Sequence, residues 1–116
     1  LEMVVGAKND RGCGPVILVG LGGVWIEALR AAELLPPDIT HARAVDRIRA
    51  MKGAALLGPF RGQPRRDVGA LADVVLALGN AMRADPSIRE IDINPVMVFA
   101  EGAGVMALDA LIVRDK

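Results

Sequence analysis

Two apolar segments, Ile88–Phe99 (IREIDINPVMVF) and Val105–Val113 (VMALDALIV), carry the clearest structural signal in the sequence. Both are rich in β-branched residues, and in parts of them apolar and polar residues alternate, a pattern that predicts two β-strands. The linker between them contains Glu101-Gly102, a dipeptide that can form a two-residue hairpin turn. We therefore expect the two segments to pair as an antiparallel hairpin.

The turn sets the register of this hairpin. If Glu101-Gly102 occupies the turn, Ala100 pairs with Ala103. Counting back along both strands then places Asn94 directly opposite Asp109. Directly opposed residues project from the same face with their Cβ atoms roughly 5 Å apart, whereas a slip of one residue would separate them.

Alternation along a strand divides the hairpin into two faces. One face is expected to be wholly apolar and to face the core, and in the first strand it contains Ile91, Ile93, Met97 and Phe99. The other face presents three oxygen-bearing side chains. It also carries apolar neighbours, and their presence implies that the three side chains are partly buried. The oxygen-bearing residues are Asp92, Asn94 and Asp109, and the neighbours are Val96, Val98 and Leu111.

Carboxylate and amide oxygens of this kind suit Mg²⁺, a hard cation that takes one or two carboxylates together with phosphate oxygens and water. The partial burial supports a metal, because buried carboxylates need a partner. The alternative is that these three residues are solvated polar positions on an exposed sheet face, and spacing alone leaves both interpretations open.

The remaining segments predict further strands and two helices. Strands are expected at Met3–Ala7 and Val16–Val19, whereas Val24–Leu35 fits either a helix or a strand ending at Pro36-Pro37. Thr40 and Asp67 are predicted helix N-caps, and the second helix carries an apolar stripe. The order of elements predicts an α+β fold, with a largely antiparallel sheet and two main helices on one face. The stripe comprises Val68, Leu71, Val75, Leu78 and Met82.

The composition of the chain argues against several classes of protein. The 116 residues include 14 basic and 14 acidic side chains, so no global field would hold a nucleic acid or an anionic membrane. The apolar run Gly12–Ile26 is too short and too glycine-rich to span a bilayer, and no signal peptide is visible. A single cysteine, Cys13, excludes internal disulfides and cysteine zinc sites and fits the reducing cytoplasm. Because the sequence starts abruptly in a strand-like segment, we expect residues 1–116 to be one subdomain of a longer chain.

Several motifs, in order and at matching spacings, resemble one family. The segment Glu90–Pro95 resembles the E-x-D-x-N-P signature of the nucleoside-diphosphate-forming acyl-CoA synthetases, in the carboxyl-terminal lobe of their ATP-grasp domain. Each of the other pieces is weak alone, but together they cover nearly the whole chain. They are the opening Glu2–Gly6, the turn Asp10–Pro15, the glycine segment Gly20–Gly23 with Glu27, Arg61-Gly62 with Asp67, and Asp109 in the closing strand.

The resemblance implies an ATP-grasp carboxyl-terminal lobe and roles for individual residues. Asn94 and Asp109 would hold the Mg²⁺ that bridges the ATP phosphates, with Asp92 as a third ligand or a support for the other two. The glycine segment would line the nucleotide site, although a tight turn between strands is an equal alternative. The implied nucleotide-binding residues are Gly20, Gly22, Gly23, Glu27 and Arg61. His41 has no counterpart in the family, and we expect it to be an exposed residue at a helix start.

The resemblance also implies a reaction. The parent would convert a carboxylic acid, CoA and ATP into acyl-CoA, ADP and phosphate, using a CoA-binding domain and a phosphohistidine domain that this chain lacks. Residues 1–116 alone are then expected to be inactive. Two alternatives stay open: a regulatory synthetase-like domain of a protein acetyltransferase, and a lobe that serves only domain packing. The acyl substrate and self-association into a homo-oligomer are not specified by the sequence.

Overall fold

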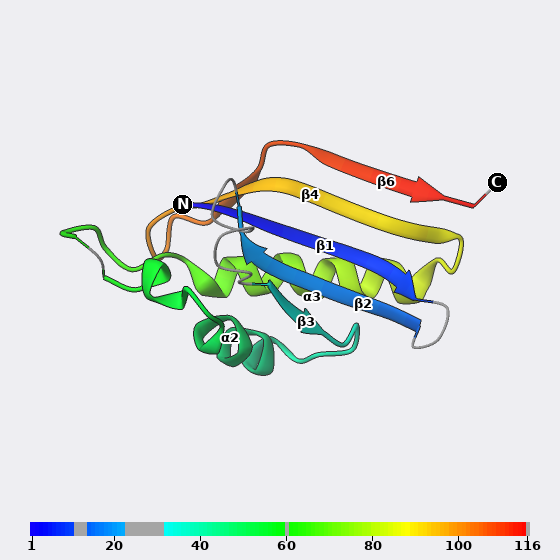
Figure 1. Ribbon diagram of the computed structural model, residues 1–116, viewed down its shortest axis with the longest axis horizontal. Coiled ribbons are helices and arrows are strands. Elements are labelled where there is room, and N and C mark those ends of the chain that lie inside the picture. Colours follow the sequence, from blue (N-terminus) through cyan, green and yellow to red (C-terminus); the bar gives the residue numbers. More distant parts are fainter. Residues whose placement is uncertain (11–13, 23–31, 60, 116) are drawn as a thin grey trace.

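The sheet is antiparallel throughout its described extent and joins strands from both ends of the chain. The computed structural model describes residues 1–10, 14–22, 32–59 and 61–115. Within these residues six strands form one sheet in the order β3-β2-β1-β4-β5, and β6 also pairs with β4. Figure 1 shows β1 running beside β4 at the centre of the sheet. The strands are β1 (Glu2–Asp10), β2 (Gly14–Leu21), β3 (Ala32–Leu35), β4 (Ile88–Val98), β5 (Val105–Ala107) and β6 (Ala110–Arg114).

Among the described residues, two α-helices cover one face of this sheet. Helix α3 (Val68–Ala84) packs on β1, β2 and β4, while α2 (His41–Ala50) packs beside it and on β3 (Figure 1). A short 3₁₀ helix, η1 (Ala54–Leu57), follows α2. The fold predicted from the sequence, α+β with two helices on one face of an antiparallel sheet, is therefore confirmed. Among the described residues, no helix is both long and apolar enough to cross a membrane.

Both helices begin where their capping residues predict. The Thr40 hydroxyl accepts a hydrogen bond from the Arg43 backbone N–H at 3.2 Å. The Asp67 carboxylate accepts one from the Ala70 N–H at 3.1 Å. Each cap satisfies an N–H that has no partner inside its helix. Helix α3 ends at Ala84, directly before Asp85-Pro86, because a proline cannot continue a helix.

The core lies between the helices and the sheet. All five residues of the predicted α3 stripe are buried, and they pack against alternate residues of β1 and β2. No polar side chain is buried among the described residues, so apolar side chains make up the described part of the core. The facing strand residues are Met3, Val5, Ile17, Val19 and Leu21.

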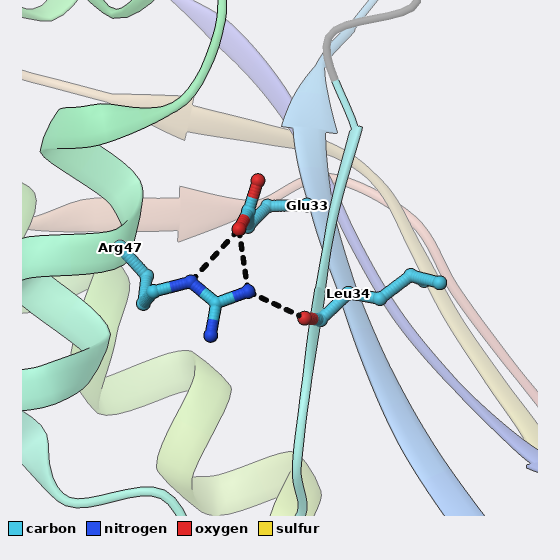
Figure 2. A network of polar contacts seen from close by, with 3 residues as sticks. All are labelled: Glu33, Leu34 and Arg47. Atoms are coloured by element: carbon cyan, nitrogen blue, oxygen red, sulfur yellow. Dashed lines mark hydrogen bonds and ion pairs between the residues drawn. The ribbon is translucent and has the colours of Figure 1, made fainter.

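An ion pair attaches α2 to the outer strand β3 (Figure 2). The Arg47 guanidinium donates to one Glu33 carboxylate oxygen from Nε at 2.8 Å and from Nη2 at 2.5 Å. Its Nη2 also donates to the Leu34 carbonyl at 3.1 Å. Ala32–Leu35 pairs with β2, so the end of the ambiguous segment Val24–Leu35 is a strand. Val24 to Ala31 lie outside the described residues.

A β-bulge in β4 changes which residues of this strand face the core. Met3 pairs with Val96 and Val5 pairs with Ile93, so two residues of β4 lie opposite one residue of β1. The extra residue shifts the alternation, and Val96 and Val98 enter the core at 0% exposure. The predicted core face was therefore wrong in its second half: Met97 is only half-buried and Phe99 is 37% exposed.

Candidate functional site

The predicted register of the carboxyl-terminal hairpin is confirmed. The Ala103 N–H donates to the Ala100 carbonyl at 2.8 Å, which closes the expected two-residue turn. Beyond it, Val96 pairs with Ala107, and the predicted second strand is divided into β5 and β6 without a change of register. The Asn94 N–H donates to the Asp109 carbonyl at 3.1 Å, so these two residues lie opposite each other.

The three oxygen-bearing residues lie on this hairpin, but their surroundings differ from the expectation. Asp92 is half-buried, whereas Asn94 and Asp109 are exposed. The expected partial burial is therefore confirmed for Asp92 but wrong for Asn94 and Asp109. Val96 and Val98 point into the core because of the bulge, and Leu111 is 58% exposed.

Asp92 lines a hollow of about 280 Å³ on the sheet face that the described helices leave open. Apolar side chains from three strands line much of it, and Gly6, the pairing partner of Asp92, lies in its floor. A Cβ at Gly6 would stand 3.2 Å from the Ile91 carbonyl oxygen, and the absence of a side chain at this position leaves the hollow open there. The apolar lining residues include Val4, Val16, Leu18 and Leu34.

Lys8 also lines this hollow and was not identified as a candidate from the sequence. It pairs across the sheet with Glu90, two residues before Asp92. The sequence does contain a signal for Lys8, because Val4, Gly6 and Lys8 alternate along β1 with the core residues. The strand predicted from the sequence, Met3–Ala7, ends one residue before Lys8, whereas β1 extends to Asp10.

The glycine segment is more regular than predicted. Gly20 lies inside β2, where it pairs with Val4 and Ala32, so the expected loop does not start at this residue. The Gly22 N–H donates to the Glu2 carbonyl at 3.0 Å, and a Cβ at Gly22 would stand 3.2 Å from Glu2 backbone atoms. Gly23 and Glu27 lie outside the described residues.

Arg61 lies in the exposed turn between η1 and α3, with a left-handed backbone at φ 50°, and Gly62 follows at φ 77°. Asp67, which ends the same motif, has a second role beyond capping α3. Its second carboxylate oxygen accepts from the Gly102 N–H at 3.1 Å and from the Gly104 N–H at 2.9 Å. The hydrogen bonds from Ala70, and then those from Gly104 and Gly102, lower the pKa of the Asp67 carboxyl below its usual value.

Asp67 thus connects the start of α3 to the hairpin turn, and that turn sets the register of Asn94 and Asp109.

His41, at the start of α2, is partly exposed and contacts the Asp73 carboxylate at 3.1 Å and the Gly69 carbonyl at 3.0 Å. Across the described residues, no group of three or more His, Cys, Asp or Glu side chains is placed to hold a metal ion. The hairpin set differs in kind, because it combines two carboxylates with an amide.

Comparison with known proteins gives the family. Residues 1–113 match the family model of an ATP-grasp domain. The chain is 45% identical over 115 residues to a trans-feruloyl-CoA synthase from an unknown prokaryotic organism, which covers 99% of this chain and 16% of that protein. It is 34% identical to the beta subunit of an ADP-forming acetate–CoA ligase I from Pyrococcus furiosus, covering 97% of this chain and 47% of that subunit.

A solved structure supports the same family assignment. The fold matches the dinucleotide-forming acetyl-coenzyme A synthetase 1 of Candidatus Korarchaeum cryptofilum, crystallised with coenzyme A and Mg-AMPPCP, at a TM-score of 0.90 and 30% identity. That match covers 99% of this chain and 53% of the solved chain. The present chain thus spans only part of each relative. By sequence and by fold, the chain belongs to the ATP-grasp domain family, and its relatives include ADP-forming CoA ligases.

Proposed function

We propose that this chain supplies part of the magnesium–nucleotide site of an ADP-forming acyl-CoA synthetase, which converts a carboxylic acid, CoA and ATP into acyl-CoA, ADP and phosphate. The observation that carries this proposal is the hairpin register, which sets Asn94 opposite Asp109. The activity follows the named CoA ligases among the relatives. Because the chain spans 16% of the trans-feruloyl-CoA synthase, the CoA-binding and phosphohistidine domains would lie outside these 116 residues.

The donor set fits Mg²⁺. Asp92 and Asp109 offer carboxylate oxygens and Asn94 offers an amide oxygen, all of which are hard ligands that leave room for phosphate oxygens and water. Since Asn94 and Asp109 are exposed, a phosphate chain could approach both of them. A bound Mg²⁺ would neutralise charge on the phosphates during phosphoryl transfer.

The neighbouring hollow fits the rest of a nucleotide. Its apolar walls, Val4, Leu18 and Leu34, would pack against a purine ring. The charged residues that line the same hollow are Lys8, Glu90 and Asp92. Leu34 is 59% exposed in this structure, so a bound base or a covering lobe would remove apolar surface from water.

The test uses the full-length protein with γ-labelled ATP and Mg²⁺, without acid or CoA. We expect label on the protein. We expect Asp109→Asn to lower it by at least about 100-fold, since a neutral amide lacks the carboxylate charge, and losing that charge removes several kcal/mol of electrostatic stabilisation at the metal. Asp46→Asn is the matched control, because Asp46 is an exposed acid on α2. Residues 1–116 alone should not turn over ATP.

Two results would contradict the proposal. Full labelling in the Asp109→Asn variant would remove Asp109 from the nucleotide site. Bound ATP without any protein label in the wild type would favour a regulatory synthetase-like domain over an active enzyme.

A further inference from the structure

A second hollow, also of about 280 Å³, lies on the helix side of the sheet, where the end of α2, η1 and the start of α3 meet. Ala54, Leu57 and Val68 form apolar parts of its wall. Three arginines also line it, and none of its described lining residues is acidic. We call this hollow the arginine pocket; its basic residues are Arg49, Arg65 and Arg66.

The backbone that carries two of these arginines is held on both sides. The Arg66 N–H donates to the Leu57 carbonyl at 2.7 Å, and the Glu101 N–H donates to the Arg65 carbonyl at 2.9 Å. Arg66 also forms a β-bridge with Ala100 in the hairpin turn. The third arginine, Arg49, comes from the last turn of α2. The pocket is therefore formed by three separately anchored segments, which favours a preorganised site.

Little of this positive charge is compensated. Arg65 approaches Glu101 only to 3.9 Å, and both side chains are more than half exposed. The Arg66 guanidinium donates to the Val98 carbonyl at 3.5 Å, which is a neutral acceptor. Within the described part of the chain, neither Arg49 nor Arg66 forms an ion pair. Three arginine residues thus line one hollow of a chain whose net charge is zero.

We propose that the arginine pocket binds a small organic phosphate, at a site separate from the nucleotide site on the opposite sheet face. Guanidinium groups match phosphate oxygens with paired hydrogen bonds, and several of them favour a dianion over a carboxylate. The apolar wall formed by Ala54, Leu57 and Val68 accepts the organic part. The volume of about 280 Å³ is near the lower end of small-molecule pockets, roughly 300–1,000 Å³, which suits a small organic phosphate.

The experiment is calorimetric titration of the full-length protein with phenyl phosphate, inorganic phosphate and benzoate. We expect saturable binding that is tightest for phenyl phosphate. Arg49→Gln should weaken it roughly tenfold, because a charge-assisted hydrogen bond is lost. Arg83→Gln is the matched control, since Arg83 is also an exposed arginine in the last turn of a helix and lies outside the pocket.

Two further variants separate the apolar wall from the charges and this site from the nucleotide site. Ala54→Leu should weaken phenyl phosphate more than inorganic phosphate, because the added side chain fills the hollow. Asp109→Asn should leave the affinity for phenyl phosphate unchanged. Absence of saturable binding to the wild type, equal losses in Arg49→Gln and Arg83→Gln, or a loss in Asp109→Asn alone would each overturn the proposal.

Discussion

The two faces of the sheet have different roles. On the helix side, Met3, Val5, Ile17 and Val19 are all 0% exposed. On the open side, Leu34 and Leu111 are 59% and 58% exposed, and the candidate metal ligands lie on the same hairpin as Leu111. The apolar burial that stabilises the fold is therefore concentrated away from the residues that carry the proposed chemistry. Substitutions on the two faces should consequently differ in kind, with one set changing stability and the other changing ligand binding.

The same substitution on each face gives the largest expected contrast. Leu71 on α3 is 0% exposed, so Leu71→Ala should lower the free energy of unfolding by about 3 kcal/mol through lost burial and a residual cavity. Leu111→Ala should change it by less than about 0.5 kcal/mol, because that side chain already meets water. Urea denaturation of both variants measures the difference. Similar losses in the two would show that the open face also stabilises the fold.

A pair of glycines on α3 tests how closely the helix side is packed. A Cβ at Gly79 would lie 2.2 Å from the Pro37 carbonyl oxygen, which is far inside contact distance. We expect Gly79→Ala to cost about 2 kcal/mol, although alanine is otherwise the better helix former. Gly69, in the first turn of α3, is the control, since its nearest neighbour would be Asp67 Oδ1 at 3.7 Å. Gly69→Ala should be neutral or stabilising in thermal denaturation, and a neutral Gly79→Ala would mean that the Pro37 segment can move aside.

Asp67 joins the helix layer to the hairpin, and its effect should depend on pH. Asp67→Asn keeps an acceptor for the cap, but its amide nitrogen cannot accept from Gly102 and Gly104. We expect a loss of about 1 kcal/mol at pH 7. Because the folded pKa of Asp67 is lowered, its stabilisation is present above the unfolded pKa of about 4 and is lost as pH falls through the folded value.

The difference in unfolding free energy between wild type and Asp67→Asn should therefore shrink below roughly pH 4. Denaturant titrations at several pH values measure it, with Asp46→Asn as an exposed control. A difference that stays constant down to pH 2 would show that the Asp67 charge is not linked to folding.

Features set by neighbouring residues could be predicted from the sequence. Thr40 and Asp67 cap their helices because a capping side chain bonds to an N–H only three residues ahead. The register that opposes Asn94 and Asp109 follows from a two-residue turn, since hairpin pairing propagates outward from its loop. The stripe on α3 identified its buried face for the same reason, because helical periodicity is a local property.

Features that depend on distant segments could not be predicted in this way. Val96 and Val98 face the core because β4 has a bulge where it pairs with β1, a strand from the other end of the chain. The alternation of residues within β4 alone does not indicate that bulge. Likewise, Arg49 and Arg66 look like separate surface charges in the sequence, and they line one pocket only because α3 packs beside α2. Local hydrogen bonding thus specified the elements and the hairpin register, whereas packing between distant strands and helices determined which side chains meet.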